Sequence, residues 1–341
     1  MAYTERKELY KKIQRKRKRP LLVYVTSIRP GVSVMMAQDV IPEIIRHIDS
    51  IKETDNGIDI FIISTGGDPI VSLRIDNLLR DRFTKLSAMI PYNAYSAATL
   101  LALGADEIIM HPYANLGPVD PQLTITRPNQ PPMNFAYEDI KKYVEFVKDI
   151  GISDQELMQK SFELLTKEVG TVPIGVAKRS SQLALSMSEK LLSSHMEDKA
   201  KAKSISEMLN TAFYHHGYPL SRNEAKEIGL QIADNDPDII KWMWEICEDF
   251  SNEMIFNEYF DMQKMVSEAI NNNFKPTDIG KFKSIRNTFK IAAVESINGE
   301  SYIEQVTDIN YIIASDLNVT QNITQYTESW KNDMIGGGRN K

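Results

Sequence analysis

Two adjacent glycines, Gly66 and Gly67, follow directly after the apolar segment 58–65 (IDIFIIST). A buried strand that ends in such a pair brings backbone close to a neighbouring group, because glycine has no side chain. The pair matches neither common phosphate-loop pattern, G-x-G-x-x-G or G-x-x-x-x-G-K-S/T. Two interpretations remain: a tight structural turn, or backbone amides that face a developing oxyanion.

The oxyanion interpretation requires a nucleophile, and Ser96 is a candidate about 30 residues later. It begins the small-residue segment 96–105 (SAATLLALGA), which is predicted to be a helix. Serine at a helix start often only caps the helix through its hydroxyl. It also lies where the helix dipole favours negative charge, and the amide of Ala97 can face a reacting carbonyl. Both uses of the hydroxyl are open at this point.

Alternating strands and helices are predicted to position these residues. Continuous apolar or β-branched runs indicate strands, and apolar residues at helical spacing indicate helices. Their order is typical of right-handed βαβ units in an α/β protein, whose largely parallel sheet is covered on both faces and binds ligands at the carboxyl ends of its strands. The predicted strands are 21–27, 58–65, 86–91 and 106–112, and the predicted helices are 39–51, 71–83 and 96–105.

The composition excludes several classes of protein. With 341 residues the chain is long enough for about two domains, and its formal net charge of −6 argues against a general nucleic-acid or anionic-membrane binder. The single cysteine, Cys247, cannot form an internal disulfide, which favours a reducing compartment. No uncharged apolar stretch reaches about 18 residues, and residues 1–20 lack the apolar core of a secretory signal. We expect a cytoplasmic protein with no integral membrane segment.

Two longer segments carry a family resemblance. STGGDP (64–69) and NAYSAATLLALGADEIIMHPYANLGPVDPQL (93–123) resemble the Clp-fold serine peptidases, and among these the serine dehydrogenase proteinase family, related to signal peptide peptidase A. The segment YPLSRNEAKEIGLQI (218–232) is similar to a later helix and strand of this group. Within it, Ser221 and Glu224 also form a predicted capping box.

The resemblance implies a ClpP/crotonase-like fold, built as a spiral of ββα units, and hydrolysis of peptide bonds through an acyl-enzyme. By the match, Ser96 takes the position of the nucleophile. Gly66 and the amide of Ala97 take the oxyanion-hole positions, and Gly67 completes the loop. The resemblance also implies a homo-oligomer that acts on a peptide or protein substrate, and no cofactor or metal is expected.

The base that activates the serine is harder to assign, because a serine hydroxyl needs a proton acceptor. Clp peptidases use a histidine on the strand after the nucleophile helix, but the corresponding segment 114–121 contains none. His111 is expected to be a strand-end residue. His195, His215 and His216 lie in a polar region with no carboxylate in register, so we expect them to be exposed to solvent.

A lysine base, as in the signal peptide peptidase branch, is the remaining option. Lysine can serve only if burial or a neighbouring cation lowers its pKa. Lys178 is the best candidate: it is expected to begin an amphipathic helix after a Pro/Gly loop, and it matches a lysine of the related family. The alternative interpretation is an ordinary surface lysine beside Arg179.

The regions outside residues 20–236, the predicted peptidase domain, have separate interpretations. Residues 1–19 form a basic segment, interpreted as the solvated end of a leading helix rather than a tether to nucleic acid or lipid. Residues 237–330 are predicted to form an α+β appendage with a hairpin at Asn298-Gly299, which could cover the site, bind a partner or build the oligomer. Residues 331–341 are predicted to be a disordered tail.

These observations predict a serine peptidase with a Ser–Lys dyad of Ser96 and Lys178. The same fold also hosts proteins without hydrolytic activity, so fold alone does not determine function. The alternatives are a catalytically silent scaffold or peptide-binding module and, less favoured, an enzyme of acyl-CoA chemistry. The reactivity of Ser96 distinguishes them.

Overall fold

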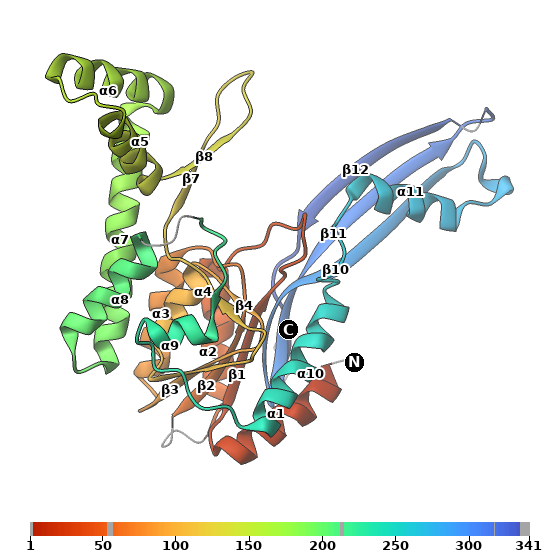
Figure 1. Ribbon diagram of the computed structural model, residues 1–341. Helices are drawn as coiled ribbons and strands as arrows, with labels where there is room; N and C mark the ends of the chain where they lie inside the picture. The colour runs from red at the N-terminus through yellow and green to blue at the C-terminus, as the bar shows by residue number, and fades with distance from the viewer. Residues whose placement is uncertain (1–2, 53–56, 212–214, 317, 335–341) are drawn as a thin grey trace.

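A mixed eight-stranded sheet runs through the computed structural model, which describes residues 3–52, 57–211, 215–316 and 318–334 (Figure 1). Its strand order is β12-β11-β10-β1-β2-β3-β5, and β13 also pairs with β11. The four predicted strands are confirmed and run parallel: β1 (Leu21–Thr26), β2 (Ile58–Ile63), β3 (Leu86–Ile90) and β5 (Glu107–Met110). The rest is antiparallel: β10 (Phe282–Ser296), β11 (Gly299–Ile313), β12 (Val319–Thr327) and β13 (Lys331–Met334).

Helices cover both faces of the parallel strands, which explains their continuous apolar runs. Alternate residues of β1 divide between two cores: Leu22 and Tyr24 belong to one, Leu21 and Val23 to the other. The first core includes residues of α2 (Ile41–Ser50), which follows the 3-10 turn Gln38–Val40, and of α3 (Pro69–Arg80) and α4 (Ala97–Leu103). The second includes α1 (Tyr3–Arg17) and α10 (Pro237–Glu253).

The basic end of α1 is held by carboxylates rather than only by solvent. Arg17 Nε lies 2.9 Å from Asp59 Oδ2, and Arg17 Nη2 lies 2.5 Å from Glu107 Oε1. Asp59 belongs to β2 and Glu107 to β5. The prediction of a leading helix is therefore confirmed, but its basic run also anchors the helix to the sheet.

Smaller elements stand beyond the carboxyl ends of the parallel strands (Figure 1). β4 (Asn93–Ala94), β6 (Asn115–Leu116) and β9 (Leu220–Ser221) form a second sheet, and β7 (Gln122–Ile125) pairs with β8 (Met133–Ala136) as a hairpin. Around them lie α5 (Tyr137–Asp149), α6 (Gln155–Val169), α7 (Thr171–His195), α8 (Lys199–Thr211) and α9 (Arg222–Glu227). The capping box of Ser221 and Glu224 at the start of α9 is confirmed.

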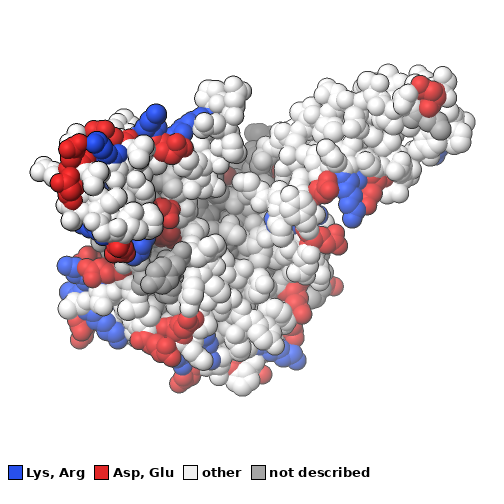
Figure 2. All heavy atoms as spheres, turned by 45° about the horizontal axis from the view of Figure 1, so that its top comes forward, with Lys and Arg blue, Asp and Glu red and all other residues white. Residues whose placement is uncertain are grey.

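The C-terminal strands extend from the body as a long arm (Figure 1). The predicted hairpin is confirmed, with Ser296 of β10 opposite Gly299 of β11, and β10 pairs with β1, so this arm continues the main sheet. The face of the arm that Figure 2 shows has few charged side chains, in contrast to the mixed charges over the helical lobe. Before β10 the chain forms α11 (Met262–Asn273) and a 3-10 turn at Pro276–Asp278. Of the predicted tail, residues 331–334 form β13, and 335–341 lie outside the described residues.

Within the described ranges, no helix is both long enough and apolar enough to cross a membrane.

Candidate active site

Ser96 stands at the turn between β4 and α4 in a backbone conformation that serine rarely adopts, with φ 52° and ψ −116°. Such a conformation costs on the order of 1–3 kcal/mol and persists only where the surroundings hold it. Two buried hydroxyls do so: Ser72 of α3 donates to the carbonyl of Ala97 at 2.5 Å, and Thr99 donates to the carbonyl of Ala94 at 2.8 Å. The Ser96 hydroxyl makes no capping bond, so the helix-cap interpretation is wrong.

The Gly66-Gly67 loop lies directly against this turn. A Cβ on Gly66, whose φ is +100°, would stand 2.6 Å from the carbonyl oxygen of Tyr95 and 2.8 Å from Ser96 Cβ. No side chain fits that space, so glycine is required at position 66 for the loop to reach the serine. The carbonyl of Gly66 accepts from the Met36 amide at 2.9 Å, which holds the loop from its other side. The sequence-based expectation of a close backbone approach is confirmed.

Backbone amides at this junction differ in whether they are already bonded. The Gly66 amide donates to Ser64 Oγ at 3.0 Å. The amides of Gly67 and Ala97 have no hydrogen-bond partner in the part of the chain that the structure describes. Ala97 is the first residue of α4, where amides have no intrahelical acceptor. Two free donors beside a serine can bind a negatively charged oxygen.

A pocket of about 390 Å³ opens over these residues. Ser96, Gly66 and Gly67 contribute to its lining, and apolar side chains from six helices, strands and loops surround them. A pocket with apolar walls and a few polar groups suits an apolar ligand group held next to a reacting atom. The apolar part of the lining is Met35, Pro69, Leu100, Val119, Pro121, Leu123, Leu183 and Ala184, and the other residues are Thr65, Gln122, Ser180 and His216.

His216 is the residue of this pocket that sequence reasoning missed. It was expected to be exposed with no carboxylate near it, but it is half-buried, and its Nδ1 lies 2.7 Å from Asp120 Oδ1. The hydrogen bond to Asp120 raises the pKa of His216. Burial opposes this effect, but the charge of the same carboxylate adds to it, so the pKa lies above its ordinary value. The expectation was wrong because Asp120 is 96 residues earlier in the chain. The only available signal was an Asp in the segment where Clp peptidases carry a histidine.

Lys178 lies elsewhere. α7 begins at Thr171, so the expected Pro/Gly loop forms the first turns of the helix, and Lys178 follows about two turns after its start. The side chain of Lys178 is exposed. Three residues of α7 line the pocket, namely Ser180, Leu183 and Ala184, and Lys178 does not. The structure therefore does not bring Lys178 to the lining that contains Ser96, and its assignment as the base stays a prediction.

His111 and His195 each contact another part of the fold. His111 follows β5 and stacks on Trp244 with ring centroids 4.9 Å apart, as expected for a strand-end residue. His195 is half-buried, and its Nε2 lies 2.9 Å from the carbonyl oxygen of Leu103, so its expected exposure is also wrong.

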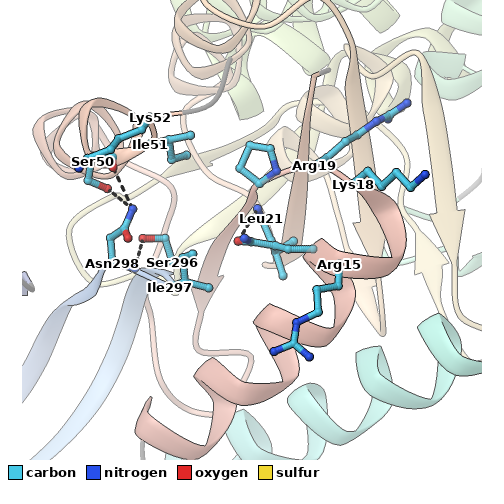
Figure 3. A pocket seen from close by; sticks show the side chains of 12 residues that line it. Arg15, Lys18, Arg19, Leu21, Ser50, Ile51, Lys52, Ser296, Ile297 and Asn298 are labelled. Atoms are coloured by element: carbon cyan, nitrogen blue, oxygen red, sulfur yellow. Dashed lines mark hydrogen bonds between the residues drawn. The ribbon is translucent and has the colours of Figure 1, made fainter. Parts of the chain in front are cut away.

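A larger cavity, of about 670 Å³, lies near the end of α1 (Figure 3). Figure 3 shows Asn298 bonded to Ser50 on one side of it and Arg15, Lys18 and Arg19 on the other. Its two serine hydroxyls are already engaged, because Ser50 Oγ donates to a carbonyl at 2.6 Å and Ser296 Oγ lies 2.9 Å from His47 Nδ1. This cavity is larger than the Ser96 pocket but has no comparable oxyanion loop in its lining.

The curated relatives include two uncharacterised proteins of Methanocaldococcus jannaschii. Each is 30% identical to this chain, over 207 and 215 residues, which is 60% and 62% of this chain. The chain spans about 63% of the length of each of these relatives. A solved structure titled as a membrane-bound stomatin-specific protease covers 66% of this chain and 84% of its own, with 14% identity and a TM-score of 0.39.

The family comparison covers the site and the four parallel strands of the sheet. Residues 3–267 match the family described as ClpP-like SDH-type serine proteinases. This range includes Ser96, the glycine loop, Asp120 and His216, and it ends before the long arm of β10 to β12. The chain therefore belongs to the family of ClpP-like SDH-type serine proteinases.

Proposed function

We propose that this protein hydrolyses peptide bonds through an acyl-enzyme on Ser96. The observation that carries the proposal is the contact between the Gly66-Gly67 loop and the strained turn at Ser96, beside two unbonded amides. Ser96 Oγ attacks the substrate carbonyl carbon, and the carbonyl electron pair moves to its oxygen. The amides of Gly67 and Ala97 donate to that oxyanion, while Gly66 allows the close approach. The amine leaves as the C–N bond breaks, and water then hydrolyses the acyl-enzyme.

The lining of the pocket supports a substrate with an apolar side chain next to the scissile bond. Leu100, Val119, Leu123 and Leu183 come from α4, the 117–121 loop, β7 and α7. Burial of an apolar side chain among them stabilises the bound substrate by roughly 25 cal/mol for each Å² removed from water. A peptide or protein that presents leucine or a similar residue fits this site.

Three sequence-based expectations lie outside this proposal and stay predictions. A Ser–Lys dyad requires the exposed Lys178 side chain to reach Ser96 from outside the pocket lining. The spiral of ββα units is supported by the small β4–β6–β9 sheet, which meets the end of β2 through a bridge between Ser64 and Ala94. Assembly into a homo-oligomer remains an implication of the family resemblance.

Labelling with a fluorophosphonate probe tests the nucleophile, because the probe reacts with activated serines. The wild type should be labelled at Ser96, shown by peptide mapping, and should hydrolyse an N-acetyl-leucine p-nitrophenyl ester. Ser96→Ala should abolish labelling and lower kcat/KM for the ester by about 10³-fold or more. Ser180→Ala is the matched control, because Ser180 lines the same pocket and should keep its activity within about twofold.

The alternatives give different results. A folded wild type that is not labelled at Ser96 and shows no ester hydrolysis supports the silent scaffold and contradicts the proposal. An enzyme of acyl-CoA chemistry predicts coenzyme A binding that survives Ser96→Ala.

A further inference from the structure

His216 and Asp120 form a pair whose geometry determines which nitrogen of the imidazole is free. Asp120 Oδ1 lies 2.7 Å from His216 Nδ1, and Gln122 Nε2 donates to Asp120 Oδ2 at 2.9 Å. An ionised carboxylate only accepts hydrogen bonds, so Nδ1 carries the hydrogen. The lone pair of the neutral ring is then on Nε2.

The pair is held at the pocket by contacts between distant segments. Asp120 lies in the loop after β6, and the amide of Val119 in that loop donates to the carbonyl of Leu209 in α8 at 3.0 Å. His216 follows α8 in sequence. This bond fastens the loop that carries Asp120 to the helix that precedes His216. Val119 and His216 both line the pocket that contains Ser96.

We propose that His216 is the general base for Ser96 and that Asp120 is the residue that positions it. The inference rests on the proposed function of Ser96. His216 Nε2 takes the proton from Ser96 Oγ, directly or through one water molecule, as the bond from Oγ to the substrate carbonyl carbon forms. The imidazolium then gives that proton to the departing amine nitrogen as the C–N bond breaks. In deacylation the same nitrogen takes a proton from the attacking water and returns it to Ser96 Oγ.

The charges around His216 are consistent with this role. Asp120 stabilises the imidazolium, which is the reason that the pKa of His216 is raised. A neighbouring recess is lined by Asp120 and His216 together with Glu138, Asp139 and Lys142 of α5 and by His215. Asp120 is the one carboxylate with a hydrogen bond to the ring among the described residues. Its removal should therefore have a larger effect on His216 than the removal of any other charge.

The experiment compares four variants of the full chain by the rate of fluorophosphonate labelling at Ser96 and by kcat/KM for the leucine ester. His216→Gln should lower both by about 10²–10⁴-fold. His215→Gln is the matched control, because His215 is the adjacent exposed histidine, and it should stay within about twofold. Lys178→Met should also stay within about twofold, whereas a Ser–Lys dyad predicts the large loss here.

Asp120→Asn allows a measurement that a purely structural role of Asp120 would not affect. The acid limb of the wild-type pH profile of kcat/KM should have a midpoint above the ordinary pKa of histidine. Without the carboxylate, the pKa of His216 falls, so the limb should move to lower pH while the maximal rate falls. This profile also tests the proposal if His216→Gln does not fold.

The outcomes separate this inference from the proposed function. Labelling of Ser96 that is lost in Lys178→Met but retained in His216→Gln overturns the His216 base and leaves Ser96 as the nucleophile. An acid limb that does not move in Asp120→Asn overturns the positioning by Asp120. A wild type that is not labelled at Ser96 overturns both proposals.

Discussion

Two regions of this protein combine a serine with a histidine: the two side chains are in direct contact at the end of β10, and they line one pocket at Ser96 and His216. At the end of β10, Ser296 Oγ lies 2.9 Å from His47 Nδ1, and both side chains are buried. In the pocket, Ser96 and His216 are half-buried and are not directly bonded in the described structure. By direct contact alone, the β10 pair resembles a catalytic dyad more than the pocket pair does.

The groups that surround the two histidines favour the opposite assignment. His47 Nε2 lies 3.2 Å from Ser301 Oγ, and Ser301 donates to Asn332 at 2.6 Å, so a neutral imidazole satisfies both hydroxyls. Burial lowers the pKa of His47 to about 4. His216 instead has a carboxylate partner, a raised pKa and access to a pocket with unbonded amides. A Ser–His contact therefore points to catalysis only where access, an oxyanion site and a positioning group accompany it.

The largest predicted effect on the β10 end is the loss of Arg6. Arg6 is fully buried and pairs with Glu295 at 2.5 Å and with Asp249. Arg6→Met leaves these carboxylates without their cation and should lower the free energy of unfolding by about 3–5 kcal/mol. Chemical denaturation measures the loss. Lys11→Met is the control, because the pair of Lys11 and Glu8 is exposed to solvent and should contribute little to stability.

The same variant sharpens the contrast with the pocket. Labelling of Ser96 per folded molecule should be unchanged in Arg6→Met, because neither Arg6 nor the carboxylates that it pairs with line the pocket that contains Ser96. Loss of labelling in folded protein would show that the two regions are coupled.

The next effect is the pH dependence of stability that His47 introduces. The folded-state pKa is about 4 and the ordinary value is 6.5. The unfolded state binds the proton first, so stability is full above pH 6.5 and is lost as the pH falls toward 4. The loss should be about 3 kcal/mol, measured by denaturation at several pH values.

His47→Gln should be less stable at pH 7 and should lose less stability between pH 6.5 and 4 than the wild type. His215→Gln, a change at an exposed histidine, is the matched control variant. A slope that is the same in His47→Gln and in the wild type would contradict a buried neutral imidazole.

The smallest effect is a change of specificity in the pocket. Leu183 lines it and is 43% exposed, so Leu183→Ala should change the free energy of unfolding by no more than about 1 kcal/mol. The ratio of kcat/KM for leucine ester to alanine ester should fall by about 10-fold, because a smaller side chain contacts the leucine less. An unchanged ratio would show that the substrate side chain does not lie against Leu183.

Local sequence determined the elements around the site and the start of its chemistry. Local residue patterns predict the parallel strands, the helix at 97–103 and the capping box at Ser221, and the structure contains all three. The close approach of Gly66 was also predictable, because two glycines after a buried strand meet the carboxyl ends of neighbouring strands. These features depend on residues near each other in the chain or on one sheet edge.

Tertiary structure alone decided which polar side chains meet. Asp120 reaches His216 across 96 residues because the loop after β6 is bonded to α8, and no local pattern records that contact. Lys178 had the local signs of a buried base, but the direction it faces depends on how α7 lies against α4 and the hairpin. Sequence determines which residues can do chemistry, whereas long-range contacts determine which of them share a pocket, because side-chain proximity depends on how the elements pack against each other.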